Sequence, residues 1–257
     1  MEAALLDVDG TVLRGEEPIP GAREGLATLR GRGLAVSFVT NNPTERPATY
    51  AGRLSALGAP VAPGDVITSM EVTLSYLQAE HPDAAVLPVA GEAIVAQLRE
   101  AGFDVVEDRA AADVVVAGYH EGFDYDDLTA GLRALRAGLP LVGTDPDRWV
   151  PTDDEPIPGS GAVVNAVAGA AEVEPEAVLG KPSAATADVL AERVGAPPAD
   201  CLLVGDRLDT DVAMGERAGM ETALVLTGAA TRADLTDAAV RPDHVLESLA
   251  DVGKLLD

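Results

Sequence analysis

The stretch Ala3-Ala-Leu-Leu-Asp7-Val-Asp9-Gly-Thr11 decides the fold class of this 257-residue chain. A short apolar run that stops at an acidic, glycine-containing turn is typical of a buried parallel strand. Apolar residues at helical spacing follow over 21–30, and a second apolar run, Leu34–Val39, ends at Thr40-Asn41-Asn42. This order of strand, helix and strand predicts a parallel sheet that is covered by helices on both faces.

The same alternation extends over the rest of the chain. It predicts core elements in this order: a helix over 47–57, a strand over 66–69, a helix over 183–194, a strand over 201–205, a helix over 210–218 and a strand over 222–227. Residues 81–175 have a βα pattern of their own, with strands at 85–89, 105–106, 114–117 and 141–142 and helices at 91–101 and 125–137. We therefore predict an α/β protein with a Rossmann-like parallel-sheet core (1–80 and 176–257) and an inserted α/β domain (81–175).

The net charge of −25 argues against a nucleic-acid partner and against an anionic membrane surface, which both need clustered cations. No apolar run approaches the ~20 residues of a membrane span, and the acidic N-terminus is unlike a signal peptide, so we expect a cytoplasmic protein. Lys181 and Lys254 are the only lysines. This acidic, lysine-poor composition favours a halophilic host with a salt-rich cytoplasm, and a GC-rich genome remains the alternative.

Several chemistries lack their residues in this sequence. The single cysteine, Cys201, lies in an apolar run and is expected to be a buried small hydrophobe. His81, His120 and His244 are too widely separated for zinc spacing. There is no dinucleotide fingerprint, and Lys181 is followed by proline, so it does not belong to a P-loop.

Four polar clusters follow predicted strands: Asp7-Val-Asp9-Gly-Thr11, Thr40-Asn41-Asn42, Gly180-Lys181-Pro182 and Gly205-Asp206-Arg-Leu-Asp209-Thr-Asp211. Ligands of open α/β sheets bind beyond the carboxyl ends of the strands. We therefore expect the four clusters to converge on one crevice.

The first cluster resembles the nucleophile motif of the haloacid dehalogenase superfamily in its phosphatase form. The other three resemble, in order, its hydroxyl, lysine and magnesium motifs. The large insertion between the second and third clusters, together with Thr144-Asp-Pro-Asp147 and Pro158-Gly-Ser-Gly161, is similar to the NagD and p-nitrophenyl phosphatase branch. The resemblance implies a catalytic core with an α/β cap, and Mg²⁺-dependent hydrolysis of small-molecule phosphate monoesters.

In the resembled mechanism, Asp7 attacks phosphorus and forms an aspartyl-phosphate, while Asp9 is the general acid and base. Thr40, the backbone N–H of Asn41 and the side chain of Asn42 contact the phosphoryl group, although Thr-Asn-Asn-Pro alone is more typical of a turn or helix cap. Lys181 pairs with the phosphoryl group and with Asp7.

The resemblance also implies a magnesium site and a substrate-facing segment. Asp7, Asp206 and the backbone carbonyl of Asp9 would bind the metal, while Asp211 would hold a metal-bound water or orient Lys181. Within the cap, the segment Thr144–Gly161 would face the substrate, and Asp147 is the cap residue that we expect to contact it.

Two other functions use the same scaffold. A phosphotransferase would pass the phosphoryl group to an acceptor other than water, and a non-catalytic protein would bind phosphate esters without turnover. The complete set of Asp7, Asp9, Lys181 and Asp206 favours an enzyme over a binding protein. The expected partner is a small-molecule phosphate ester, and the cap is a candidate surface for a homodimer.

Overall fold

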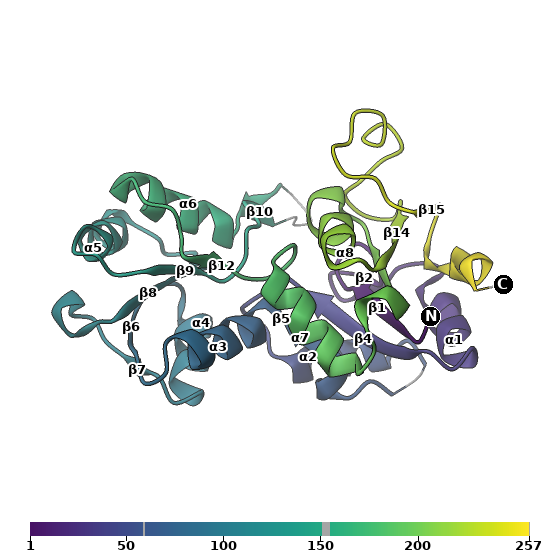
Figure 1. Cartoon of the computed structure of the whole chain (residues 1–257), viewed down its shortest axis with the longest axis horizontal. Coiled ribbons are helices and arrows are strands. Elements are labelled where there is room, and N and C mark those ends of the chain that lie inside the picture. The colour runs from purple at the N-terminus through teal and green to yellow at the C-terminus, as the bar shows by residue number, and fades with distance from the viewer. Residues whose placement is uncertain (59, 151–154, 257) are drawn as a thin grey trace. The chain divides into compact units, whose positions relative to one another are not determined.

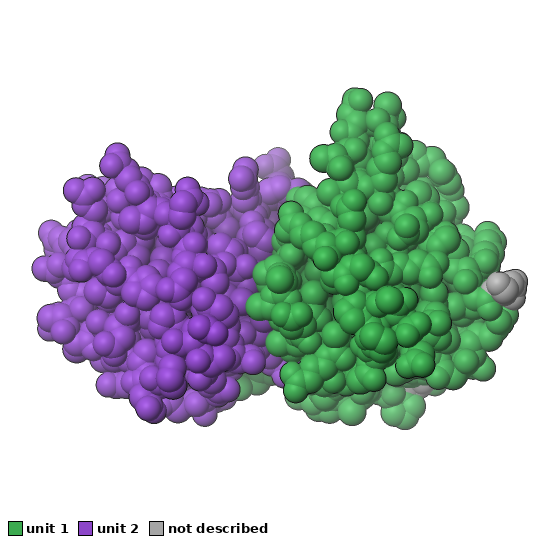
Figure 2. Space-filling model, viewed as in Figure 1, with its two compact units in different colours: residues 1–40, 46–67, 181–257 green, residues 41–45, 68–180 purple. Residues whose placement is uncertain are grey.

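The computed structural model describes residues 1–58, 60–150 and 155–256, and it divides the chain into two compact units (Figure 1, Figure 2). Unit 1 contains Met1–Thr40, Arg46–Ile67 and Lys181–Asp257. Unit 2 contains Asn41–Glu45 and Thr68–Gly180. Each unit has its own sheet and its own apolar core.

Unit 1 is built on a six-stranded sheet of order β15-β14-β13-β1-β4-β5, in which the strands from β15 to β4 run parallel. The strands are β1 (Ala3–Asp7), β4 (Ala35–Thr40), β5 (Val66–Thr68), β13 (Cys201–Gly205), β14 (Glu221–Val225) and β15 (His244–Leu246). All five residues of β1 are buried, because the strand is central and covered on both faces. This parallel-sheet α/β core confirms the predicted fold class.

Helices cover both faces of this sheet. Leu6 and Phe38 point to the face that packs with α1, α2 and the C-terminal 3₁₀ segment η5. Leu203 points to the opposite face, towards α8, which packs against α7. The helical elements are α1 (Ala22–Gly31), α2 (Pro47–Ser55), η1 (Pro63–Asp65), α7 (Ala184–Val194), η3 (Pro198–Asp200), the π-helical turn η4 (Leu208–Val212), α8 (Ala213–Ala218) and η5 (Leu249–Leu255), and a hairpin is formed by β2 (Leu13–Arg14) and β3 (Glu17–Pro18).

Unit 2 has a five-stranded parallel sheet of order β12-β9-β8-β6-β7. Helices α5 and α6 pack on one face over an aliphatic core, and α3 and α4 lie on the other (Figure 1). The elements are α3 (Ser69–Glu80), β6 (Ala85–Val89), α4 (Glu92–Glu100), β7 (Asp104–Val105), η2 (Arg109–Ala111), β8 (Val114–Ala117), α5 (Tyr125–Arg136), β9 (Leu141–Gly143), the hairpin β10 (Trp149–Val150) and β11 (Ile157–Pro158), α6 (Ser160–Ala171) and β12 (Ala177–Val178).

The boundaries between the units differ from those expected at 80/81 and 175/176. Apart from the short segment Asn41–Glu45, the chain enters unit 2 after Ile67 and leaves it after Gly180, because helix α3 and strand β12 belong to unit 2. Helix α3, which the sequence analysis did not predict, packs against α4. Strand β12 pairs with β9, so the strand that precedes Lys181 is part of the second sheet and not of the core sheet. Strand β15 was also not predicted.

The helices of both units are short. Among the described residues the longest are α3, α5 and α6, with 12 residues each. Within that part of the chain, no helix combines the length and the apolarity that are needed to cross a lipid bilayer.

Candidate active site

Three adjacent strands of unit 1 end in the predicted motifs. Asp7 is the last residue of β1 and Thr40 is the last residue of β4, while Asp206 directly follows β13. Because β13, β1 and β4 are parallel neighbours, their carboxyl ends meet at one edge of the sheet. Lys181 joins this edge through its side chain, which bonds to Asp7.

Lys181 is the centre of a buried ion-pair network. Its Nζ donates one hydrogen bond to Oδ1 of Asp7 and another, of 2.6 Å, to Oδ1 of Asp211. The second oxygen of Asp211 accepts the backbone N–H of Arg207 at 3.1 Å. These bonds hold the ammonium group against the end of β1, and they occupy both carboxylate oxygens of Asp211.

Burial and charge act against each other on the pKa values of this network. Burial alone would lower the pKa of Lys181, but Asp211 and Asp7 outweigh it and raise that pKa. Burial raises the pKa of Asp7 well above its usual range, opposed by Lys181 and reinforced by Asp211 and Asp206. The network therefore holds more carboxylate charge than one lysine can neutralise.

Asp206 lies beside this network and is also buried, with 4% of its surface exposed. Its Oδ2 accepts a hydrogen bond of 2.6 Å from the backbone N–H of Ala229. Burial first, and then the charge of Asp211, raise the pKa of Asp206 to about 6. Of the described residues, only Asp7, Asp206 and Asp211 form a cluster in which one oxygen of each lies within 4.8 Å of the others. Such a set of hard oxygen donors suits a divalent cation.

Asp9 is the exposed residue of the site, and it lies beside the buried Thr40. The Thr40 hydroxyl donates a hydrogen bond of 3.3 Å to Oδ2 of Asp9. Desolvation by the surrounding residues raises the pKa of the Asp9 carboxyl, although Asp9 has an exposed surface. A carboxylic acid that solvent can reach and that retains its proton more readily than usual is suited to proton transfer.

The other predicted site residues belong to unit 2. The side-chain amide of Asn41 donates a hydrogen bond of 3.2 Å to Oδ2 of Asp147. Oδ1 of Asn42 accepts from the backbone N–H and the hydroxyl of Thr44, at 2.9 and 2.7 Å, so this side chain caps a turn. The segment Thr144–Gly161 includes residues 151–154, which lie outside the described part of the chain.

Known proteins are similar to this chain in sequence and in architecture. A family model described as haloacid dehalogenase-like hydrolase matches residues 4–104, and a second model of HAD-like hydrolases matches residues 178–252. The sugar-phosphatase AraL of Bacillus subtilis is 34% identical over 253 residues, which are 98% of this chain and 92% of that protein. The chain belongs to the haloacid dehalogenase-like hydrolases.

Solved structures of these hydrolases show which branch is similar. A p-nitrophenyl phosphatase from Archaeoglobus fulgidus superposes with a TM-score of 0.92 at 33% identity, over 99% of this chain and 98% of that one. NagD from Escherichia coli K-12 superposes with a TM-score of 0.87 at 25% identity, over 98% of each chain. The chain is thus a NagD-like phosphatase of the haloacid dehalogenase-like hydrolases, as the order of its motifs predicts.

Two residues that contribute to this hydrolase's structure were not predicted from the sequence. Asp145 is buried in unit 2, where it accepts hydrogen bonds from Thr144 and from the backbone of Asp147. Ala229 supplies the N–H that holds Asp206. Asp145 was visible only as part of the Thr144–Asp147 motif, and no sequence signal points to a backbone donor in a loop.

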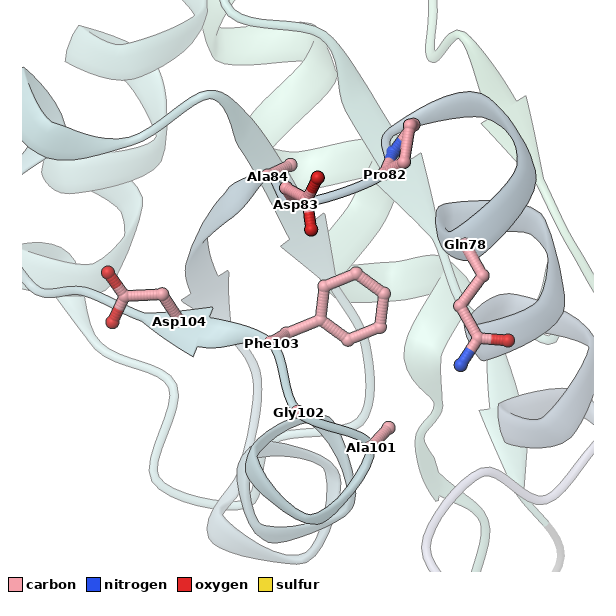
Figure 3. A pocket seen from close by; sticks show the side chains of 8 residues that line it. All are labelled: Gln78, Pro82, Asp83, Ala84, Ala101, Gly102, Phe103 and Asp104. Atoms are coloured by element: carbon pink, nitrogen blue, oxygen red, sulfur yellow. The ribbon is translucent and has the colours of Figure 1, made fainter.

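Two depressions in unit 2 lie away from the four motifs of the hydrolase family. A depression of about 440 Å³ in unit 2 is lined by residues around His120, and one of about 340 Å³ is lined by residues around Phe103. In the second, the Phe103 ring lies among Gln78, Asp83 and Asp104 (Figure 3). None of its eight lining residues is cationic, so it does not offer a phosphate site.

Gly228→Ala is expected to displace the side chain of Asp206. A Cβ at Gly228 would lie 1.9 Å from Oδ2 of Asp206, so the carboxylate or the loop must move. We expect a loss of about 1–3 kcal/mol in the free energy of unfolding, which is typical of overpacking, measured by urea denaturation. Gly52→Ala in α2 is the control, because its Cβ would meet nothing within 4 Å. Equal stability of the two variants would contradict this packing.

Proposed function

We propose that this phosphatase hydrolyses small-molecule phosphate monoesters in a magnesium-dependent reaction, with the Asp7 carboxylate as nucleophile. The observation that carries the proposal is the state of this buried carboxylate. Its Oδ1 accepts a bond from Lys181, and its Oδ2 has no hydrogen-bond partner among the described residues. An orphaned buried oxygen is costly unless a ligand or an ion satisfies it.

The residues present fit Mg²⁺. The orphaned Oδ2 of Asp7 and the carboxylate of Asp206 are the side chains that would hold it, and the backbone carbonyl of Asp9 would complete the protein ligands. Asp211 lies in the same cluster, but Lys181 and a backbone N–H already occupy its oxygens, so we assign it to orienting Lys181. A bound Mg²⁺ would neutralise carboxylate charge and screen Asp7 from an incoming phosphate dianion.

The reaction needs a nucleophile, a proton donor and a positive charge near the phosphoryl oxygens. Oδ1 of Asp7 attacks phosphorus, the ester P–O bond breaks, and an aspartyl-phosphate forms. Asp9 gives its proton to the leaving oxygen and then takes a proton from the water that hydrolyses the intermediate. Such acid–base assistance contributes typically about 10²–10⁴-fold to the rate.

Lys181 and Thr40 supply the contacts to the phosphoryl group. The ammonium of Lys181 already touches Asp7, so it can pair with phosphoryl oxygens at the point of attack. The Thr40 hydroxyl, which donates to Asp9, can donate to a phosphoryl oxygen instead. The backbone N–H of Asn41, the next residue, and the side chain of Asn42 remain proposed substrate contacts. Asp147, which the sequence analysis expected to contact the substrate, accepts a hydrogen bond from the Asn41 side chain, and the kinetics of its variants decide between a substrate contact and a positioning role.

The proposal assigns the catalytic core to unit 1 and the cap domain to unit 2. A cap of this size favours small substrates over polymers, and one similar protein is named a sugar phosphatase. We therefore propose phosphate esters of small metabolites, such as sugar phosphates, as the substrate class. The acidic surface also supports our proposal of a cytoplasmic protein that works in concentrated potassium salt.

Removal of magnesium is expected to abolish phosphate release. The assay measures inorganic phosphate from p-nitrophenyl phosphate in high potassium chloride, with Mg²⁺ and then with a chelator. We expect Asp206→Asn to raise the Mg²⁺ concentration that gives half-maximal activity by at least ~10–100-fold, since even outer-sphere changes have effects of that size. Full activity in chelator, or an unchanged Mg²⁺ requirement in Asp206→Asn, would contradict the proposed site.

A further inference from the structure

Three segments of unit 2 meet at one small cluster. Oδ2 of Asp147 accepts the hydrogen bond of 3.2 Å from the side-chain amide of Asn41. The backbone N–H of Asp147 donates to Oδ1 of Asp145 at 3.1 Å. The Asn41 carbonyl is itself fixed, because it accepts a bond of 2.8 Å from the hydroxyl of Ser69. The two carboxylates, Asp145 and Asp147, are called the carboxylate clamp below.

Gly180 is the third segment of the cluster. Its φ of +71° lies in the left-handed region that favours glycine, and a Cβ there would lie 2.7 Å from Oδ1 of Asn41 and 3.0 Å from Cβ of Asp145. The backbone of Gly180 therefore packs directly against the side chains of Asn41 and Asp145. Any larger residue at this position would push the segments apart.

Asp145 is buried and fixes neighbouring groups through hydrogen bonds, and it does not take part in the reaction. Only 2% of its surface is exposed, and its Oδ2 accepts the Thr144 hydroxyl at 3.1 Å. Burial first, and then the charge of Asp147, raise the pKa of Asp145 to about 8, while Ser160 also donates to it. The raised pKa means that Asp145 retains its proton more readily than an ordinary carboxyl, which lessens its repulsion with Asp147.

The two residues that the clamp contacts, Asn41 and Gly180, are each bonded in the chain to a proposed catalytic residue. Asn41 directly follows Thr40, and Gly180 directly precedes Lys181. We propose that the carboxylate clamp positions Thr40 and Lys181 by fixing the residue bonded to each. The inference rests on the proposed function, in which both residues contact the phosphoryl group.

The clamp residues act through the backbone and touch no reacting atom in this role. A peptide unit is planar, so a shift of residue 41 or 180 is passed on to the neighbouring residue. Misplacement of a contact group by about 1 Å can reduce the rate by roughly 10²-fold. Because phosphoryl contacts are common to all phosphate esters, loss of the clamp should slow every substrate alike.

The test measures kcat and KM of Asp147→Ala, Asn41→Ala and the double variant with p-nitrophenyl phosphate and with a sugar phosphate. We expect each single variant to lower kcat about 10–100-fold for both esters with little change in KM. The double variant should lose less than the product of the two single losses, because the two changes remove one shared bond. Losses that multiply, or a rise in KM for one ester only, would assign Asp147 to substrate binding and overturn the clamp.

Asp145 provides the rescue test. Asp145→Asn keeps the shape and the acceptor oxygen and should retain activity within about threefold, whereas Asp145→Ala should fall as far as Asp147→Ala. Equal loss in Asn and Ala variants would contradict a holding role. The matched control is Asp113→Asn, since Asp113 is also in unit 2 and also accepts a backbone N–H, that of Ala85 at 2.9 Å. We expect the control to be as active as wild type.

Hydrogen exchange separates positioning from general loss of folding. In Asp147→Ala, peptides that contain Thr40 and Lys181 should exchange faster, while the β8 and α5 peptides of unit 2 should not change. Faster exchange throughout unit 2, or none at the two peptides, would overturn the proposal. Inactive wild-type protein would instead count against the proposed function, so the two failures are distinguishable.

Discussion

Asp7→Asn should eliminate phosphate release while the protein remains folded. Asparagine keeps the shape of the side chain and one oxygen for the bond from Lys181, but it cannot attack phosphorus. Removal of the nucleophile in other covalent enzymes lowers kcat by roughly 10⁴-fold or more, and we expect an effect of that order. The measurement is initial phosphate release with saturating Mg²⁺ and p-nitrophenyl phosphate, compared with wild type.

The stability of the same variant provides the control. Burial raises the pKa of Asp7 in the folded protein above its ordinary value of 3.8, so folding opposes ionisation of this group. The cost of ionised Asp7 therefore grows as pH rises from the ordinary value through the raised folded one, and it is fully present above both. In chelator at neutral pH, we expect Asp7→Asn to unfold at the same or a higher temperature than wild type. A marked loss of stability would show that its inactivity reflects misfolding.

Lys181→Met should remove both activity and stability. Lys181 is 3% exposed and is bonded to Asp7 and Asp211, so its loss leaves two buried carboxylates without their cation. Breaking a buried pair from one side costs about 3–5 kcal/mol, measured here by urea denaturation in chelator. We expect kcat to fall on the order of 10³-fold, because a positive charge at the phosphoryl group is lost. Arginine should not rescue it, since its planar fork differs from a compact ammonium group.

Asp211→Asn distinguishes the two roles of Lys181. If uncompensated charge causes the instability, the double variant Lys181→Met with Asp211→Asn should recover part of the lost free energy of unfolding. It should recover no activity, because the cation is still absent. A double variant that is less stable than Lys181→Met alone would contradict the electrostatic explanation.

The strands that carry the site could be predicted because burial on both faces makes them continuously apolar. β1, β4 and β13 were found in this way, and the polar residues at or just beyond their carboxyl ends are Asp7 and Asp9, Thr40 and Asn41, and Asp206. The parallel order places these residues at one edge of the sheet without any knowledge of side-chain packing. This part of the site follows from local sequence alone.

Helix α3 shows what the apolar pattern conceals. Its buried face includes Ser69 and Thr73, which blur the apolar spacing that identifies a helix. A signal was nevertheless present, because Thr68 and Glu71 form a capping box with reciprocal bonds of 3.3 Å. Recognition of that box would have moved the unit boundary from residue 80 to residue 67.

The contacts of Asp145 could not be predicted from the sequence, and those of Lys181 with Asp7 and Asp211 were expected only from the family resemblance, because both sets depend on pairing between distant segments. Lys181 follows β12, a two-residue strand that pairs in unit 2, yet its side chain joins the carboxylates of unit 1. Asp145 is distinguished only by its burial, by the hydrogen bond that it accepts from the backbone N–H of Asp147, and by its packing against Gly180. Such contacts are fixed by the fold and leave no periodic pattern in the sequence.

Chemical trapping of the intermediate tests the account most directly. Asp9→Asn, which should slow hydrolysis of the aspartyl-phosphate, is mixed with a phosphate ester and Mg²⁺ and then treated with borohydride, which reduces an acyl phosphate to an alcohol. We predict that peptide mass spectrometry finds homoserine at position 7, only when substrate is present. Turnover by wild-type protein with reduction at another residue, or with no reduction at all in the variant, would contradict the assignment of Asp7 as the nucleophile.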